Sequence, residues 1–153
     1  MSDYFWSARF ITGTLTLLLG AALLIGALLY RPYAPAESRY ELVLGAQLAG
    51  LEAIKPGAGG RDVDAVARQR IEAAGQGEHF GHGLGHGVGL DVHEAPRLAQ
   101  RSDAVLESGN VVTVEPGVYL PGELGVRIED LVVVTPGGCE ILTGLSKELT
   151  VVA

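Results

Sequence analysis

Three histidines and two glutamates are the residues of this sequence best suited to chemistry. His82, His86 and His93 fall within a dozen glycine-rich residues, and Glu115 and Glu129 follow inside apolar stretches. Imidazole and carboxylate groups together are ligands of manganese, cobalt, iron and zinc. Because apolar stretches ordinarily exclude an unpaired charge, a shared cation accounts for the pattern better than packing does. These residues therefore predict a metal site.

Each of these residues also has a plainer explanation. A single histidine or strand glutamate is more often a surface or core residue than a ligand, and Arg127 fits an ordinary ion pair about as well as a role at the site. The metal site is predicted because the three histidines and two glutamates occur together. The zinc-peptidase motif H-E-x-x-H is excluded because no second histidine follows in His93-Glu94-Ala95-Pro96-Arg97.

The histidines lie in a segment with a glycine at every second position from 81 to 89. If this segment is extended, His82 and His86 share one face, and the glycine face is open to close approach by another element or a ligand. A nucleotide-binding loop is excluded, because the segment contains neither G-x-G-x-x-G nor G-K-[ST].

Two strands are predicted after the histidines, at 111–115 and at 126–135, with turn-rich residues 116–125 between them. Side chains two positions apart point to the same face of a strand. The polar pairs that share a face are Thr113 with Glu115 and Arg127 with Glu129. Half-buried strands can therefore aim these polar groups at one site.

Two amphipathic helices are predicted before the histidines. A capping box of Ser38 and Glu41 opens the first, which Lys55-Pro56-Gly57 ends, and the second runs from Arg61 to Gly75. The apolar residues at helical spacing are Tyr40, Val43, Leu44, Leu48 and Leu51 in the first helix and Val63, Val66, Ile71 and Ala74 in the second. Both helices are expected to support the site by packing.

The start of the chain differs from the rest. The 19 residues from Ile11 to Leu29 carry no charge, and as a helix they would be roughly 28 Å long, close to the hydrocarbon core of a bilayer. Flanking aromatic residues with Arg9 and Arg31 suit a single membrane span. A secretory signal with a cleavage site at Ala34-Pro35-Ala36 and the product of a truncated or frame-shifted gene are the alternatives.

Composition excludes several classes of protein. With 153 residues the chain is long enough for one ordinary domain. Its formal net charge of −7 and the lack of any Lys and Arg cluster argue against a nucleic acid partner. The single cysteine, Cys139, cannot form a disulfide within the chain and is predicted to be a small strand residue.

Three blocks of sequence resemble a known family. HGLGHGVGLDVHEAPRL, VVTVEPGVYLPG and GVRIEDLVVVT are similar to the C-terminal signature blocks of the pita-bread metallopeptidases, in the Xaa-Pro aminopeptidase and Xaa-Pro dipeptidase branch. The similarity runs from about Pro35 to Val152. It implies an α+β fold, the C-terminal half of a pita-bread (creatinase and methionine aminopeptidase-like) domain, with two helices on a curved antiparallel sheet. The chain then divides into an apolar segment at 1–36 and a partial metallopeptidase catalytic domain at 37–153.

The resemblance also implies a role for each site residue. His86, Glu115 and Glu129 would be metal ligands of a site for two divalent ions, with Glu129 bridging them and manganese the expected metal; cobalt, zinc and iron are alternatives. His82, His93 and Glu115 would be catalytic, and His82 and Arg127 would bind substrate. Metal-bound hydroxide would attack the carbonyl before proline, with Glu115 as the proton shuttle.

The family pattern is not complete in this sequence. Two aspartate ligands belong upstream of the helix that opens at Ser38, but Asp3 is the only acidic residue among the first 36. We therefore predict an incomplete copy of a metal-dependent peptidase that cleaves Xaa-Pro bonds, and activity of the chain alone is left open. A membrane-anchored, non-catalytic protein that binds peptides or a partner is the alternative, and a split enzyme with aspartates from another chain is a third.

The expected partners follow from this function. The substrate would be a peptide with proline at its second position, and a homo-oligomer is left open. A cytoplasmic location is expected, with a single-pass membrane protein as the alternative if residues 11–29 are an authentic span.

Overall fold

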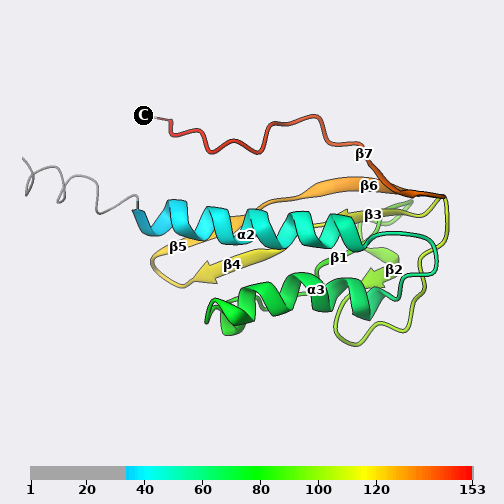
Figure 1. Cartoon of the computed structure of the whole chain (residues 1–153), viewed down its shortest axis with the longest axis horizontal. Coiled ribbons are helices and arrows are strands. Elements are labelled where there is room, and N and C mark those ends of the chain that lie inside the picture. The colour runs from blue at the N-terminus through cyan, green and yellow to red at the C-terminus, as the bar shows by residue number, and fades with distance from the viewer. Residues whose placement is uncertain (1–33, 153) are drawn as a thin grey trace, which may run out of the picture. The chain divides into compact units, whose positions relative to one another are not determined.

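The computed structural model describes residues 34–152. Two α-helices, α2 (Ala34–Ala53) and α3 (Gly60–Ala73), and a short 3-10 helix, η1 (Gly77–His79), precede all the strands (Figure 1). The strands are β1 (Gly85–Gly87), β2 (Glu94–Leu98), β3 (Val111–Val114), β4 (Gly117–Leu120), β5 (Leu124–Arg127), β6 (Asp130–Thr135) and β7 (Gly138–Ile141).

The predicted span Ile11–Leu29 lies outside the described residues. Within residues 34–152, no helix combines the length and apolar character needed to cross a bilayer. Because α2 begins at Ala34, the predicted boundary between Ala36 and Glu37 falls in the first turn of this helix. The division of the chain into two parts stays a prediction.

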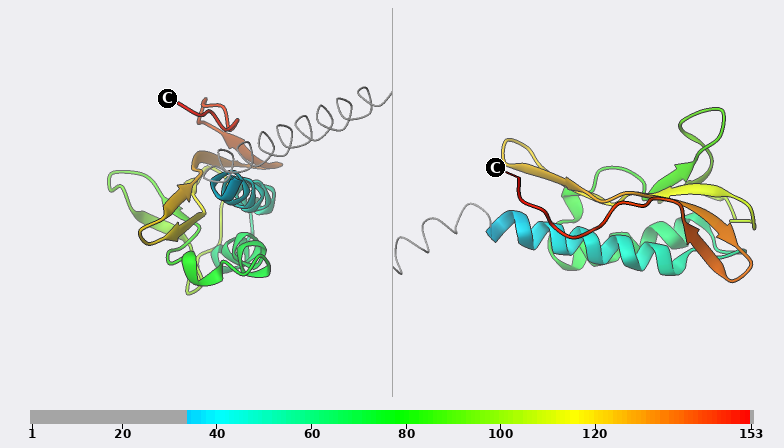
Figure 2. Two further views of the ribbon diagram at one scale, coloured as in Figure 1. Left: turned by 90° about the vertical axis from the view of Figure 1, so that its left-hand side faces the viewer. Right: turned by 90° about the horizontal axis from the view of Figure 1, so that it is seen from above.

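Antiparallel pairing builds both sheets. Five strands are ordered β2-β1-β3-β6-β7, and β4 and β5 form a separate two-stranded sheet. Both helices lie on the same side of the strands (Figure 2). This arrangement confirms the predicted α+β class with helices packed on an antiparallel sheet.

Helix α2 begins earlier than the predicted capping box. The helix starts at Ala34, so Ser38 lies inside it. Pro35 suits the first turn, because an N–H at that position would have no partner within the helix. The end is as predicted, since α2 stops at Ala53, just before Lys55-Pro56-Gly57.

The residues that are buried on the two helices differ in part from the apolar residues that were predicted to pack. Val43 and Leu51 of α2 and Val63 and Ile71 of α3 are buried as predicted. Leu48 is 47% exposed and Val66 41% exposed, so their assignment to the core was wrong. Polar residues take the buried positions instead. Gln47 is fully buried because its amide donates a hydrogen bond to Asp130.

The segment 126–135 forms two strands, and the prediction of one continuous strand was wrong. Arg127 ends β5, which pairs with β4, whereas Asp130 opens β6, which pairs with β3. Between them the Ile128 amide donates to the carbonyl of Pro116 at 3.4 Å. The chain thus changes sheets at Ile128 and Glu129, and Glu129 does not share a strand face with Arg127.

Cys139 is a strand residue, as predicted. It lies on β7, with its sulfur 3.6 Å from the carbonyl oxygen of Leu51. Burial, with a smaller contribution from the charge of Asp130, raises the pKa of the Cys139 thiol. The thiol is therefore protonated at neutral pH and poorly suited to act as a nucleophile.

Glycine is required at Gly85, where β1 passes close to β3. A Cβ at Gly85 would lie 1.8 Å from the carbonyl oxygen of Thr113. We expect Gly85→Ala to lower the free energy of unfolding by about 1–3 kcal/mol, because backbone must move to admit the methyl group. Urea unfolding measures this loss. Gly81→Ala is the control, since a Cβ there meets no atom within 4 Å; equal stability of the two variants would contradict the prediction.

Candidate active site

Glu115 follows strand β3 and lies at the centre of the site. Its carboxylate is buried, and Thr113, on the same face of the chain, donates a hydrogen bond to Oε1 over 2.9 Å. Nε2 of His86 lies 3.0 Å from the same oxygen, and Nη1 of Arg127 lies 3.1 Å from Oε2. Side chains from β1, β3 and β5 therefore hold this carboxylate in place.

The ring of His86 on β1 has one nitrogen committed to the backbone. Nδ1 lies 3.0 Å from the carbonyl oxygen of Gly87, which can only accept, so Nδ1 carries a proton. A neutral ring then presents a lone pair at Nε2 to Glu115. Two acceptors that face each other need a proton or a cation to hold them together. Their 3.0 Å separation also suits neighbouring ligands of a cation bonded at about 2.1 Å.

His93 lies beside His86, in the exposed loop between β1 and β2. The two ring centroids are 4.3 Å apart and the ring planes are inclined at 52°. His93 therefore presents a polar ring next to the His86 and Glu115 pair, where it can contact a bound molecule.

His82, Tyr119 and Arg127 form a second cluster. Nδ1 of His82 donates to the carbonyl oxygen of Gly83 at 2.8 Å, which leaves Nε2 to accept hydrogen bonds. Tyr119 Oη lies 3.1 Å from this nitrogen and Arg127 Nη2 lies 3.4 Å from it. Arg127 Nε also donates to Tyr119 Oη over 2.6 Å. The cluster links His82 to Glu115 through Arg127.

Arg127 supplies a permanent positive charge at the site. Partial burial acts to lower its pKa, but the hydrogen bond from its guanidinium to Tyr119 and the charges of Tyr119, Glu115 and Glu129 outweigh burial and raise the pKa above its usual value. The guanidinium is therefore charged at neutral pH.

One pocket brings most of the predicted site residues together. We call it the central pocket; it has a volume of about 210 Å³. Five of the six predicted site residues line it: His82, His86, His93, Glu115 and Arg127. Glu129 instead lines a neighbouring pocket of about 220 Å³, to which Arg127 also contributes. The site residues thus lie on both sides of Arg127.

The described residues fit a divalent cation only in part. His86 and Glu115 have the donor chemistry and the spacing of two ligands of one ion. Glu129 does not join them, and residues 34–152 contain no group of three or more His, Cys, Asp or Glu side chains arranged to hold a metal ion. The ligand role of Glu129 stays a prediction.

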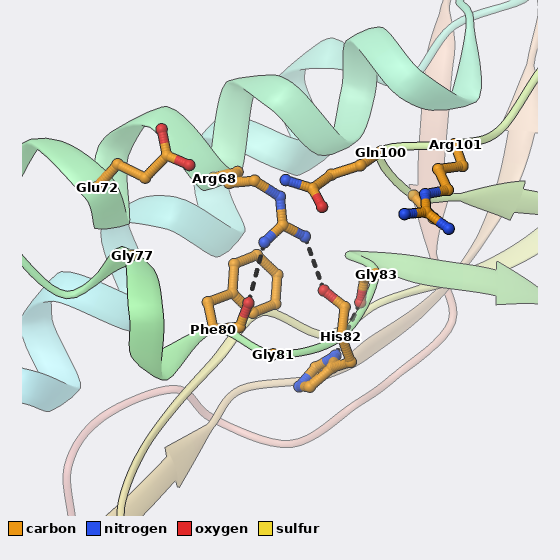
Figure 3. Close-up of a pocket in the computed structure, with 10 residues that line it drawn as sticks. Arg68, Glu72, Gly77, Phe80, Gly81, His82, Gly83, Gln100 and Arg101 are labelled. Carbon is orange, nitrogen blue, oxygen red and sulfur yellow. Dashed lines mark hydrogen bonds between the residues drawn. The ribbon is translucent and has the colours of Figure 1, made fainter.

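A buried ion pair on α3 supports the segment before β1 that carries His82. Arg68 contacts both carboxylate oxygens of Asp64, at 2.8 and 2.9 Å. Its guanidinium also donates to the carbonyl oxygens of Phe80 and His82, at 3.0 and 2.7 Å (Figure 3). Asp64 in turn accepts a hydrogen bond from the Leu84 amide at 2.9 Å. The pair therefore fixes the backbone on both sides of His82.

Sequence reasoning did not assign these supporting residues to the site. Thr113 was placed on the face of Glu115, but its hydrogen bond could not be foreseen. The pair of Asp64 and Arg68 could have been recognised from the sequence as a signal, since opposite charges four residues apart on a helix form ion pairs. Tyr119 carries none, because its hydroxyl reaches His82 and Arg127 only through the pairing of β4 with β5.

Comparison with known proteins places this arrangement in a family. A sequence profile of metallopeptidase family M24 matches residues 22–136. An Xaa-Pro dipeptidase of Pyrococcus furiosus is 49% identical over 110 residues, which are 72% of this chain and 32% of that protein. The chain thus spans about a third of the length of the curated relatives it matches.

Solved structures agree with the sequence match. The Xaa-Pro dipeptidase from Bacillus anthracis superposes with a TM-score of 0.74 at 54% identity, over 76% of this chain and 33% of that one. The X-Pro aminopeptidase from Thermotoga maritima gives a TM-score of 0.75 at 47% identity, over 78% of this chain and 34% of that one. The fold is the C-terminal half of a pita-bread domain. The paired helices, the antiparallel sheet and the matched sequence together show that this chain belongs to metallopeptidase family M24.

Proposed function

We propose that this chain carries the part of a metal-dependent Xaa-Pro peptidase site that binds and cleaves the peptide bond before proline. The proposal rests on one observation, which is that five predicted site residues line the central pocket: His82, His86, His93, Glu115 and Arg127. Relatives that match this chain bear the names Xaa-Pro dipeptidase and X-Pro aminopeptidase. The proposed substrate is a peptide with proline at its second position.

The proposed ligands are His86, Glu115 and Glu129, with two divalent ions in the complete site and manganese as the expected metal. When bound, divalent ions supply a hydroxide nucleophile at neutral pH and positive charge near the carbonyl oxygen. His86 and Glu115 already have the spacing of neighbouring ligands. Glu129 would have to turn from its neighbouring pocket to join them.

The remaining residues of the pocket have roles that follow from their contacts. Glu115 can accept a proton and pass it to the leaving proline nitrogen, because it is the one carboxylate that lines the central pocket. His93 can donate a hydrogen bond to the substrate carbonyl. Arg127, charged and joined to His82 through Tyr119, can hold a carboxylate at the proline end of the substrate.

Release of free proline from the dipeptide Ala-Pro by the purified chain tests this proposal. We expect proline release with added Mn²⁺ and none after chelation. His86→Ala should abolish it, whereas His79→Ala, a matched change outside the central pocket, should preserve it. Metal-independent release would contradict the proposal, and binding of Ala-Pro without any release by the unmodified chain would favour the second candidate.

A peptide-binding protein without turnover is the second candidate. It is favoured by the contacts of Glu115, whose two oxygens already have Thr113, His86 and Arg127 as partners. In this case Ala-Pro should bind near His82 and Arg127 without being cleaved. Membrane anchoring through residues 11–29, a cytoplasmic location and a homo-oligomer remain predictions.

A further inference from the structure

The hydroxyl group of Thr113 connects the two residues of the His86 and Glu115 pair. Thr113 lies on β3 and is only 3% exposed. Its Oγ1 accepts a hydrogen bond from the backbone amide of His86 at 3.1 Å and donates one to Oε1 of Glu115 at 2.9 Å. One buried hydroxyl therefore joins the main chain of the first residue to the side chain of the second.

The chemistry of the partners fixes the direction of both hydrogen bonds. A backbone amide can only donate, so Oγ1 accepts from His86 and has its single proton left for Glu115. The Oε1 atom that receives this proton is the same atom that lies 3.0 Å from Nε2 of His86. The strands come this close because Gly85 has no side chain: a Cβ there would lie 3.0 Å from Oγ1 of Thr113. Thr113 therefore holds Oε1 toward His86.

Arg127 offers the same carboxylate a competing arrangement. Its Nη1 lies 3.1 Å from Oε2 of Glu115, and its side chain is 44% exposed, so it has room to move. Its Nη2 makes only a long contact, 3.4 Å, with His82. A guanidinium prefers to bind both oxygens of a carboxylate side by side, and that arrangement would turn Oε1 away from His86. The rotation would leave the buried Thr113 hydroxyl without its acceptor, which opposes it.

We propose that Thr113 is a positioning residue that keeps Glu115 available to a divalent cation and prevents a two-point ion pair between Glu115 and Arg127. This inference rests on the proposed function and deepens it, because it names the group that decides between two states of one carboxylate. Hydrogen bonds that orient a metal ligand typically change metal affinity by about 10- to 100-fold. The hydroxyl of Thr113 is therefore expected to control how tightly the central pocket holds a metal ion.

Four substitutions isolate the effect of the hydroxyl. Thr113→Val keeps the shape of the side chain and removes the hydroxyl, Thr113→Ala removes it with a smaller side chain, and Thr113→Ser retains it. Thr135→Val is the matched control, since Thr135 ends β6 and lies outside the central pocket. A fifth substitution, Arg127→Met, removes the competing guanidinium and keeps an unbranched side chain. Urea unfolding establishes that each variant is folded before metal is added.

The experiment is an NMR titration of the isotope-labelled chain with Mn²⁺, which gives a Kd from the broadening of central-pocket resonances. We expect Thr113→Val and Thr113→Ala each to raise this Kd by about tenfold or more, and Thr113→Ser and Thr135→Val to keep it within about threefold. In the Arg127→Met background, Thr113→Val should raise the Kd by less than about threefold, because no competing ion pair remains.

Spectra recorded without metal provide a second, independent readout. In Thr113→Val the Nη2 protons of Arg127 should move downfield, because they gain a charged hydrogen bond to Glu115. In Thr113→Ser and Thr135→Val these protons should keep their original positions. This signature reports the turning of the carboxylate, which a general loss of stability would not produce.

Failure of the inference can be told apart from failure of the proposed function. If the unmodified chain binds Mn²⁺ at the central pocket and Thr113→Val keeps the original Kd, Thr113 does not position Glu115, and the proposed function stands. The same conclusion follows if Thr113→Val weakens binding equally with and without Arg127. If the unmodified chain does not bind Mn²⁺ at this pocket, the proposed metal site fails, and the inference fails with it.

Discussion

Replacing Glu115 by glutamine is expected to lower kcat/KM for Ala-Pro by about 1,000-fold. The amide keeps the size of the side chain and can still accept the hydrogen bond from Thr113. It cannot carry a proton to the leaving nitrogen, and it removes the negative charge that faces His86 and Arg127 at 3.0 and 3.1 Å. Proline release at saturating Mn²⁺ measures the effect.

The matched control for this variant is Glu107→Gln. Glu107 is exposed and lies outside the central pocket, so the same change of charge should alter kcat/KM less than twofold. A Glu115→Gln variant that keeps more than a tenth of the original activity would contradict the role of Glu115 as proton shuttle.

Asp64→Ala is expected to have the largest effect on stability, a loss of about 3–5 kcal/mol in the free energy of unfolding. The side chains of Asp64 and Arg68 are only 1% and 9% exposed, so the variant leaves a buried guanidinium without its counter-ion. It also removes the acceptor of the Leu84 amide. Urea unfolding followed by circular dichroism measures the loss.

Asp62→Ala is the control for this prediction. Asp62 is exposed in the first turn of α3, where a carboxylate stabilises the helix by about 0.3–1 kcal/mol. Equal losses in the two variants would show that the buried pair contributes no more than a surface charge at the helix start.

Much of the fold could be predicted from local patterns. Helix ends were recognisable because Pro56 and Gly57 stop α2, and Gly75 follows α3. The alternating glycines correctly predicted close approach, since a Cβ at Gly85 or Gly87 would collide with the backbone of a neighbouring strand. Such features depend on a few adjacent residues, so sequence reveals them directly.

Long-range pairing explains the errors. The sequence of residues 126–135 indicates one apolar strand. In the structure β5 pairs with β4 and β6 pairs with β3, so the strand is interrupted at Glu129. Gln47 is buried and its amide donates to Asp130, which is 83 residues away in sequence, whereas the neighbouring Leu48 is exposed. Local hydrophobicity does not contain this information.

The candidate site likewise has features that depend on adjacent residues and features that depend on long-range contacts. Residue type and spacing selected His82, His86 and Glu115, and the structure places these three side chains around one pocket, while their roles stay predictions. The hydroxyl groups that orient them, on Thr113 and Tyr119, could not be predicted, because each acts through a contact that only the folded sheets create.

Binding of Mn²⁺ to the pair formed by His86 and Glu115 tests the metallopeptidase centre most directly. Paramagnetic broadening in NMR spectra of the chain locates the ion, and His86→Ala shows whether binding depends on the pair. We predict that substoichiometric Mn²⁺ broadens the resonances of His86, Glu115 and their neighbours in the central pocket first, and that His86→Ala removes this effect. Broadening confined to exposed carboxylates elsewhere, or unchanged by His86→Ala, would contradict a metal centre at this pocket.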